Sequence, residues 1–247
     1  MSFIKKTPFG QIILLKKLLI GLLGLVSYPG FFLLNRSKVS GAEILRKLPV
    51  KNVLIVSNHQ TYFADVAFIF HCIFSSLGGF PNKPYIPSFL WKMKSGLYFV
   101  AAEETMKGGW LPKLFAYGGA ISIKRTWKSE GKEVNRPVDL SDSQNILTAL
   151  ETGWVITFPQ GTTSPFAQGR KGTAHLIKET QPIVIPLVID GFRRAFDKKG
   201  LKFKKRRTTL RLRMKKPLLI DYNASVDEIL KLVMTSIEQI EEEEEEA

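Results

Sequence analysis

The sequence predicts an α/β fold, in which a single domain has a largely parallel central sheet flanked by helices and preceded by an apolar helical segment. Apolar strand-like runs alternate with helical stretches along the chain, a pattern typical of parallel sheets. Two of these runs are almost entirely apolar, as are strands buried on both faces. With 247 residues, 45% hydrophobic and 23% charged, the chain is long enough for one compact core.

Five short apolar runs predict the strands, and three longer stretches predict helices. The strands are expected at residues 53–56, 120–123, 154–158, 183–189 and 210–214, and the helices at residues 64–77, 141–152 and 225–238. The last strand alternates apolar and basic residues, which predicts one solvated face. Pro186 falls inside the fourth strand, so we expect it at a sheet edge, at a bulge or where the strand ends.

The N-terminal region carries an uncharged run at residues 18–34, directly after Lys16 and Lys17. A membrane-spanning helix needs about 20 apolar residues, and no small-residue cleavage pattern of a secretory signal follows. The run favours a helix pair, broken near Pro29, that dips into one leaflet with the lysines at the headgroups. A true span and a buried core helix remain open. We therefore expect a membrane-associated segment at 1–40, a domain at 41–240 and an acidic tail at 241–247.

The net charge of +14 points to a polyanionic partner, which can be nucleic acid, anionic lipid or an anionic substrate. Residues 198–216 contain eleven Lys or Arg and no acid. Phe203 is the one aromatic residue in this segment, which makes it poor at stacking on bases. Membrane lipid is therefore the expected partner and nucleic acid is not. A non-catalytic basic binding module remains the alternative from another class.

Several common site motifs are missing from the chain. There is no G-x-S-x-G, no G-x-x-x-x-G-K-[ST] and no G-x-G-x-x-G, which disfavours a hydrolase serine and nucleotide binding. The three histidines lie far apart, without the cysteine or H-x-x-x-H pairing of zinc sites. We therefore expect no metal site.

His59 is the candidate catalytic residue because it directly follows the predicted strand 53–56. Ligands of open α/β sheets bind at this carboxyl edge. A neutral imidazole there can take a proton from a hydroxyl if a carboxylate fixes its tautomer. Asp65 is the nearest carboxylate in sequence, and Asn58 and Thr61 are candidate caps of the following helix. The alternative is a histidine that is merely hydrogen-bonded beside a helix cap.

A second polar turn, F-P-Q-G-T-T-S at residues 158–164, follows another predicted strand. Turns at the ends of neighbouring strands can line one cleft, and Gly161 allows a ligand to approach the backbone closely.

Four segments in order resemble the glycerolipid acyltransferase family, which contains the 1-acylglycerol-3-phosphate O-acyltransferases. They are Asn58-His59 with Asp65, G-A-I-S-I-K-R at 119–125, F-P-Q-G-T-T at 158–163 and I-V-I-P at 183–186. Lys171-Gly172 resembles the family's K-G step after the third segment.

The resemblance implies transfer of an acyl group from acyl-CoA or an acyl carrier protein thioester to a lysophospholipid hydroxyl, most simply that of 1-acylglycerol-3-phosphate. It implies no cofactor besides this co-substrate, and a place on the cytoplasmic face of the inner or plasma membrane. His59 would be the general base and Asp65 its partner. The substrate-binding residues carried over by position are Arg125, Gln160, Gly161, Thr162 and Lys171.

Three departures from the family pattern affect these expectations. Five residues rather than four separate His59 from Asp65, and on a continuous helix one extra residue turns a side chain by about 100°, so the turn must absorb the insertion. Gln160 stands where the family has glutamate, and Thr163 where it has arginine. Lys124, Arg125, Arg170 and Lys171 are candidate replacements for that arginine. A different lyso-lipid acceptor, such as an acylated amino-acid lipid, therefore remains open.

Overall fold

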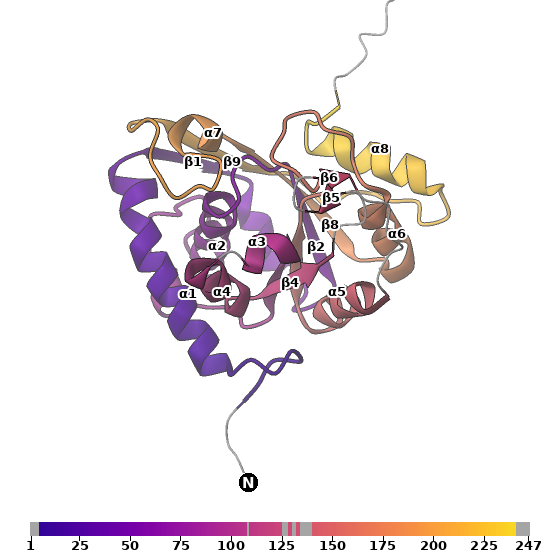
Figure 1. Ribbon diagram of the computed structural model, residues 1–247, viewed down its shortest axis with the longest axis horizontal. Helices are drawn as coiled ribbons and strands as arrows, with labels where there is room; N and C mark the ends of the chain where they lie inside the picture. Colours follow the sequence, from indigo (N-terminus) through magenta and orange to yellow (C-terminus); the bar gives the residue numbers. More distant parts are fainter. Residues whose placement is uncertain (1–4, 108, 125–127, 130–131, 134–139, 241–247) are drawn as a thin grey trace, which may run out of the picture.

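The computed structural model describes residues 5–107, 109–124, 128–129, 132–133 and 140–240 (Figure 1). Seven strands form one sheet in the order β1-β9-β8-β2-β7-β3-β4, and neighbouring strands are parallel except for the β8–β9 pair. The strands are β1 (Arg36–Ser40), β2 (Val53–Ser57), β3 (Leu97–Ala102), β4 (Ala120–Ile123), β7 (Trp154–Thr157), β8 (Ile183–Asp190) and β9 (Thr209–Met214), and a separate hairpin joins β5 (Lys128–Ser129) to β6 (Lys132–Glu133). The expected α/β fold with a largely parallel sheet is confirmed.

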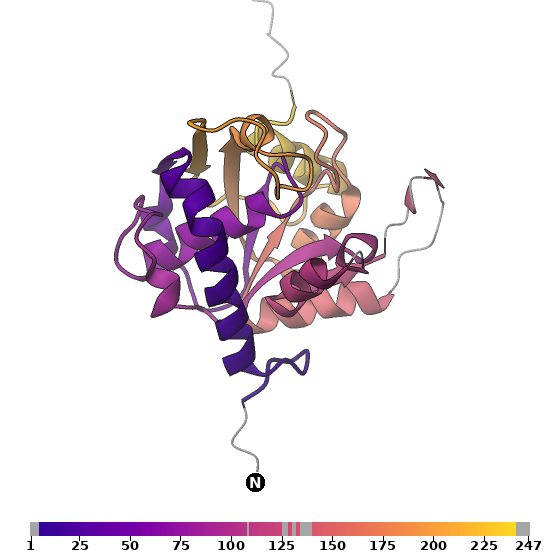
Figure 2. The same cartoon turned by 60° about the vertical axis from the view of Figure 1, so that its left-hand side comes forward.

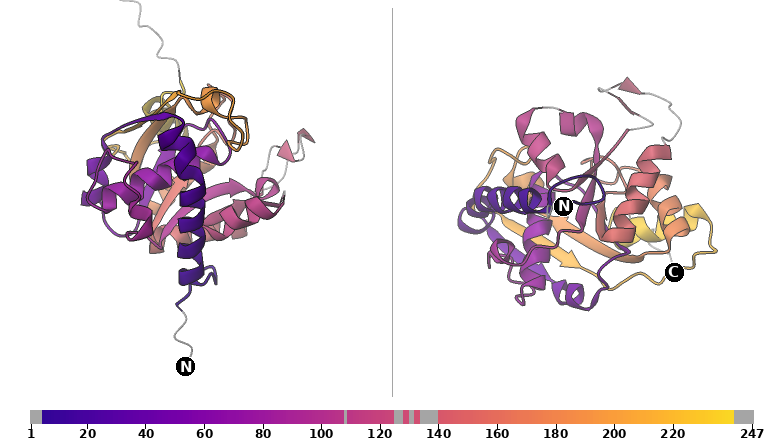
Figure 3. Two further views of the ribbon diagram at one scale, coloured as in Figure 1. Left: turned by 90° about the vertical axis from the view of Figure 1, so that its left-hand side faces the viewer. Right: turned by 90° about the horizontal axis from the view of Figure 1, so that it is seen from below.

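Helices cover both faces of the sheet (Figures 1 and 3). One face packs against α1 (Ile13–Tyr28), α2 (Ala64–Leu77) and α4 (Trp110–Tyr117), and the other against α5 (Leu140–Thr152), α6 (Lys171–Thr180) and α8 (Val226–Ser236). Shorter helical elements are η1 (Pro29–Leu33), η2 (Ala42–Lys47), η3 (Ser88–Leu90), α3 (Glu103–Lys107) and α7 (Phe192–Ala195).

The central strand β2 is buried on both faces, which explains the unbroken apolar run at residues 53–56. Val53 and Ile55 point into the core beneath α1 and α2, whereas Leu54 and Val56 point into the core beneath α5, α6 and α8. Because successive side chains of a strand face opposite sides, a strand buried on both faces must be apolar at every position. β2 ends at Ser57, and the turn that carries His59 starts there.

Pro186 lies in the middle of β8, an interior strand, so our expectation of an edge, a bulge or the end of its strand is wrong. Its backbone is in register with Val56 of β2, and its carbonyl accepts a hydrogen bond from Lys215 N at 2.9 Å on the opposite side. The N–H and C=O of one strand residue point to the same side. The N–H that proline lacks would therefore face the side where β9 has just ended at Met214, so no ladder bond is lost.

The N-terminal helix runs along the outside of the domain (Figure 2) and is not broken into a pair at Pro29. The chain passes from α1 into the π-helical turn η1, which closes with Leu34 N donating to Pro29 O at 2.9 Å. β1 begins at Arg36 and pairs with β9, so the sheet starts inside the segment 1–40 that we expected to be membrane-associated.

Lys16 anchors α1 to the domain instead of lying at a headgroup. Its ammonium donates to the carbonyls of Ser95, at 2.9 Å, and Leu97, at 3.1 Å, and lies 4.3 Å from the ring centroid of Tyr98. Burial lowers the pKa of Lys16 to about 7. The outward face of the same helix is apolar and exposed, at Leu14, Leu18, Leu22, Leu25 and Val26.

Candidate active site

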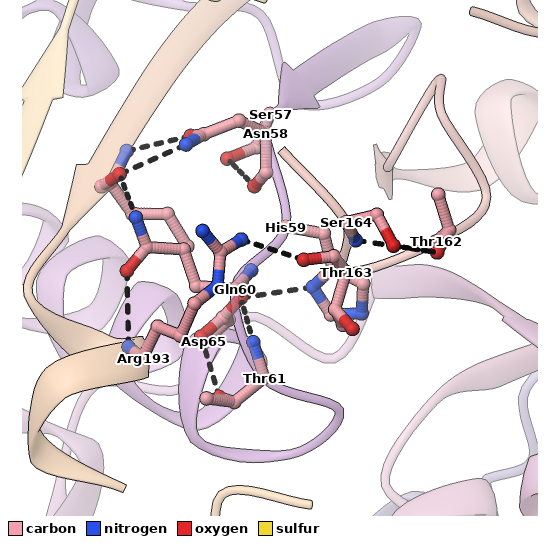
Figure 4. Close-up of polar contacts among 11 residues, drawn as sticks. Ser57, Asn58, His59, Gln60, Thr61, Asp65, Thr162, Thr163, Ser164 and Arg193 are labelled. Carbon is pink, nitrogen blue, oxygen red and sulfur yellow. Dashed lines mark hydrogen bonds and ion pairs between the residues drawn. The ribbon is translucent and has the colours of Figure 1, made fainter. Parts of the chain in front are cut away.

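The candidate site is built by turns at the carboxyl ends of β8, β2 and β7, three adjacent strands of the sheet. His59 follows β2, the turn 158–164 follows β7, and α7 follows β8 (Figure 4). The carboxyl edge of a parallel sheet is the usual binding edge of such folds.

His59 and Asp65 form a hydrogen-bonded pair, with 2.9 Å between His59 Nδ1 and Asp65 Oδ2 (Figure 4). α2 begins at Ala64, so Asp65 lies in its first turn and residues 60–63 precede the helix. The extra residue between the two side chains is therefore absorbed in the turn, and the rotation it would cause on a continuous helix does not arise.

Four hydrogen bonds hold the Asp65 carboxylate, which is fully buried. Oδ2 accepts from His59 Nδ1, from Gln60 N at 2.5 Å and from Thr61 N at 2.9 Å, and Oδ1 accepts from the Thr61 hydroxyl at 2.6 Å. A carboxylate only accepts hydrogen bonds, so Nδ1 of His59 carries the proton and Nε2 carries the free lone pair. The geometry thus presents the imidazole in the tautomer that a general base needs.

Asn58 and Thr61 have other roles than the helix capping that we expected. Phe63 is the N-cap residue of α2 and makes no side-chain cap bond. Asn58 Nδ2 donates to the carbonyl of Ile189 at 2.9 Å, and Asn58 Oδ1 accepts from Ile189 N at 2.8 Å. These two hydrogen bonds join the turn after β2 to the end of β8, whereas the backbone N–H and hydroxyl of Thr61 donate to the Asp65 carboxylate.

Phe158 covers one side of the His59 ring, with ring centroids 4.0 Å apart and an interplanar angle of 22°. The His59 side chain is 13% exposed, so a substrate can still reach it. Phe158 was noted in the sequence only as part of a motif; the structure shows that it links the turn after β7 to the candidate base.

Of the other predicted site residues, Gly161 and Thr162 lie in the turn after β7, whereas Lys171 contacts α8. Gly161 has φ of 62°, the left-handed region that glycine allows, and forms the tight turn after β7. The Thr162 hydroxyl accepts from Ser164 N at 3.3 Å within the same turn. Lys171 begins α6, and its ammonium pairs with Asp227 of α8 at 2.8 Å. Arg125 lies outside the described residues.

Gln160 points into the protein. It is 1% exposed, and its amide nitrogen donates to the carbonyl of Ala167 at 2.9 Å, so it braces the loop that leads to α6. Its buried amide oxygen has no hydrogen-bond partner within the described part of the chain.

Sequence reasoning missed two polar residues of this site, Gln60 and Arg193. Gln60 Nε2 donates to Ile189 O at 3.2 Å, and its Oε1 accepts from Arg193 N at 3.2 Å. The Arg193 guanidinium donates to the carbonyl of Thr163 at 2.6 Å. The position of Arg193 just beyond a predicted strand was the signal that could have found it.

The comparison with family models decides the family. The model described as "Acyltransferase" matches residues 36–190, the stretch from β1 to the end of β8. The chain belongs to the acyltransferase family. This confirms the resemblance and the class of enzyme that the four segments indicated.

A solved structure supports the fold of this acyltransferase. The chain is similar to the crystal structure of the 1-acyl-sn-glycerophosphate acyltransferase PlsC from Thermotoga maritima, with a TM-score of 0.51 and 19% identity, over 89% of this chain and 77% of that one. A search of curated proteins gave no match.

Proposed function

We propose that this acyltransferase moves a fatty acyl group from a thioester, acyl-CoA or acyl carrier protein, to the hydroxyl of 1-acylglycerol-3-phosphate, giving phosphatidate. The hydrogen-bonded His59–Asp65 pair at the carboxyl edge of the sheet is the observation that supports this chemistry most directly. The thioester is itself the activated acyl group, so the proposed reaction needs no cofactor.

In the proposed mechanism His59 Nε2 removes the proton of the acceptor hydroxyl as its oxygen attacks the thioester carbonyl. The Asp65 carboxylate holds Nδ1–H and stabilises the imidazolium that forms. The tetrahedral intermediate then collapses, the carbon–sulfur bond breaks, and the thiolate takes the proton from His59. One ester bond forms and one thioester bond is lost, and the histidine returns to its starting state.

The acyl chain is proposed to pack against an apolar pocket between α1 and α2. The pocket is lined by side chains of α1 such as Leu23, of α2 such as Phe70, and by Phe89, Phe99 and Phe115. Hydrocarbon that packs against such apolar side chains is removed from water, which is favourable.

The protein is proposed to work at the membrane surface where such chains reside, on its cytoplasmic face. Within the described residues, Ile13–Leu33 is the one helix that is long and apolar enough to cross a membrane by length and composition. Its inner side is fixed to the domain through Lys16 and Ile20, while Leu14, Leu18, Leu22 and Leu25 face outward. An amphipathic helix of this kind lies in the interface plane, and the basic residues of 198–207 would add attraction to anionic lipid.

An acylated amino-acid lipid is the second candidate acceptor, because Gln160 and Thr163 supply no charge in the turn after β7. The experiment is a radiolabelled acyl-transfer assay on the purified protein, with lysophosphatidate and a lyso-amino-acid lipid side by side. Phosphatidate as the preferred product supports the proposal. Preference for the amino-acid lipid would replace the acceptor, and no transfer to either would refute the function.

A further inference from the structure

Arg193 is a cationic residue at the candidate site that lies outside the four family segments. It lies at the start of α7, three residues beyond β8 and beyond the matched region 36–190. Its backbone N–H is held by Gln60, the residue after His59, and its guanidinium reaches Thr163 O (Figure 4). Thr163 belongs to the same turn as Phe158, which stacks on the His59 ring.

The charge of Arg193 is not neutralised within the described part of the chain, where no ion pair includes it. Neighbouring arginines differ: Arg194 and Arg211 both pair with Asp190, and Arg213 pairs with Glu238. One N–H of the Arg193 guanidinium is used by Thr163 O, and a guanidinium has five. Arg193 is exposed, so its other donors are open to a ligand.

The turn after β7 supplies no charge of its own to bind an anion. Residues 158–164 are all uncharged, and the Asp65 carboxylate is fully occupied by its four donors. A planar guanidinium with several free donors matches the geometry of phosphate oxygens. An anion bound there would lie at the same carboxyl edge of the sheet as His59, between α7 and the turn after β7.

We propose that Arg193 is an anion-binding residue that holds the phosphate of the lyso-lipid acceptor beside His59. This rests on the proposed function and adds a residue that determines the acceptor. The phosphates of a CoA donor have the same chemistry, so the experiment must separate the two sources.

The test compares Arg193→Gln, Arg193→Lys and the control Arg194→Gln, whose side chain is exposed on the same short helix. KM is measured for 1-acylglycerol-3-phosphate and for monoacylglycerol of the same chain, and for acyl-CoA and a phosphate-free acyl-pantetheine donor. Arg193→Gln should raise KM for the phosphate acceptor about tenfold and leave KM for monoacylglycerol unchanged. Arg193→Lys should recover part of the loss, and Arg194→Gln should match the wild type.

An equal rise in KM for both acceptors would overturn the inference, because it would mean that Arg193 only supports the Thr163 turn. A rise for acyl-CoA alone would overturn it in favour of the donor. Calorimetric titration with glycerol 3-phosphate is independent of activity: weaker binding in Arg193→Gln, and not in Arg194→Gln, supports the site even if lysophosphatidate is not the substrate. Unaltered binding in Arg193→Gln counts against it.

Discussion

Replacing Asp65 by asparagine tests how the buried carboxylate supports His59. The amide oxygen can take the place of Oδ2 and keep the bonds to His59, Gln60 and Thr61, so the turn can persist while the negative charge is lost. With Nδ1 and Oδ2 2.9 Å apart, the charge centres lie about 4 Å apart, and at an effective dielectric of about 20 their attraction is about 4 kcal/mol. Because this attraction exists only when His59 is protonated, kcat should fall about 10³-fold.

The assay is thiol release from acyl-CoA in the presence of the lyso-lipid, with kcat and KM measured separately. Asp221→Asn, at an exposed turn, is the matched control and should behave like the wild type. Circular dichroism and urea unfolding of both variants show whether the fold is retained. A folded Asp65→Asn protein that keeps more than about a tenth of wild-type kcat would refute the role assigned to the carboxylate.

Three further predictions concern stability and membrane binding. Burial lowers the pKa of His71 to about 3 from 6.5, so the stability it contributes is complete above pH 6.5 and is lost as the pH falls toward 3. The free energy of unfolding, measured with urea, should therefore fall by about 2 kcal/mol less between pH 6.5 and pH 5 in His71→Leu than in the wild type. An identical pH dependence in both proteins would contradict this. A methyl group on Gly200, where φ is +79°, would lie 2.6 Å from Ala64 N, so Gly200→Ala should destabilise the turn before α2 and lower kcat. The control is Gly10→Ala, at φ +77° with no atom within 4 Å of the added methyl group, which should carry the same backbone strain without loss of kcat. Leu18 is 62% exposed on the outer face of α1, and Leu18→Asp should weaken sedimentation with anionic vesicles about tenfold or more; undiminished sedimentation would argue against membrane contact through this face.

The strands buried on both faces could be predicted from the sequence, because burial imposes an apolar residue at every position. β2, β7 and β8 were all found, and their ends place the candidate site. β1 was missed because Arg36–Ser40 is a polar edge strand whose residues alternate between exposed and half-buried. β3 also was missed, although Leu97–Ala102 is apolar.

Contacts between residues far apart in the chain could not be predicted from the sequence, because they depend on which strands become neighbours in the sheet. The contact between Asn58 and Ile189 joins residues 131 positions apart. The Arg193–Thr163 contact arises because β8 and β7 both flank β2. Conversely, Lys171 matched a family step by position, but its ammonium pairs with Asp227 on the α8 side.

Acyl transfer by a His59→Ala variant tests directly whether His59 is the catalytic base. His175→Ala is the control, since His175 is an exposed histidine of α6. With acyl-CoA and 1-acylglycerol-3-phosphate, His59→Ala should form phosphatidate only at the background rate, while His175→Ala should keep wild-type activity. A folded His59→Ala protein with full activity would show that His59 is not the catalytic base.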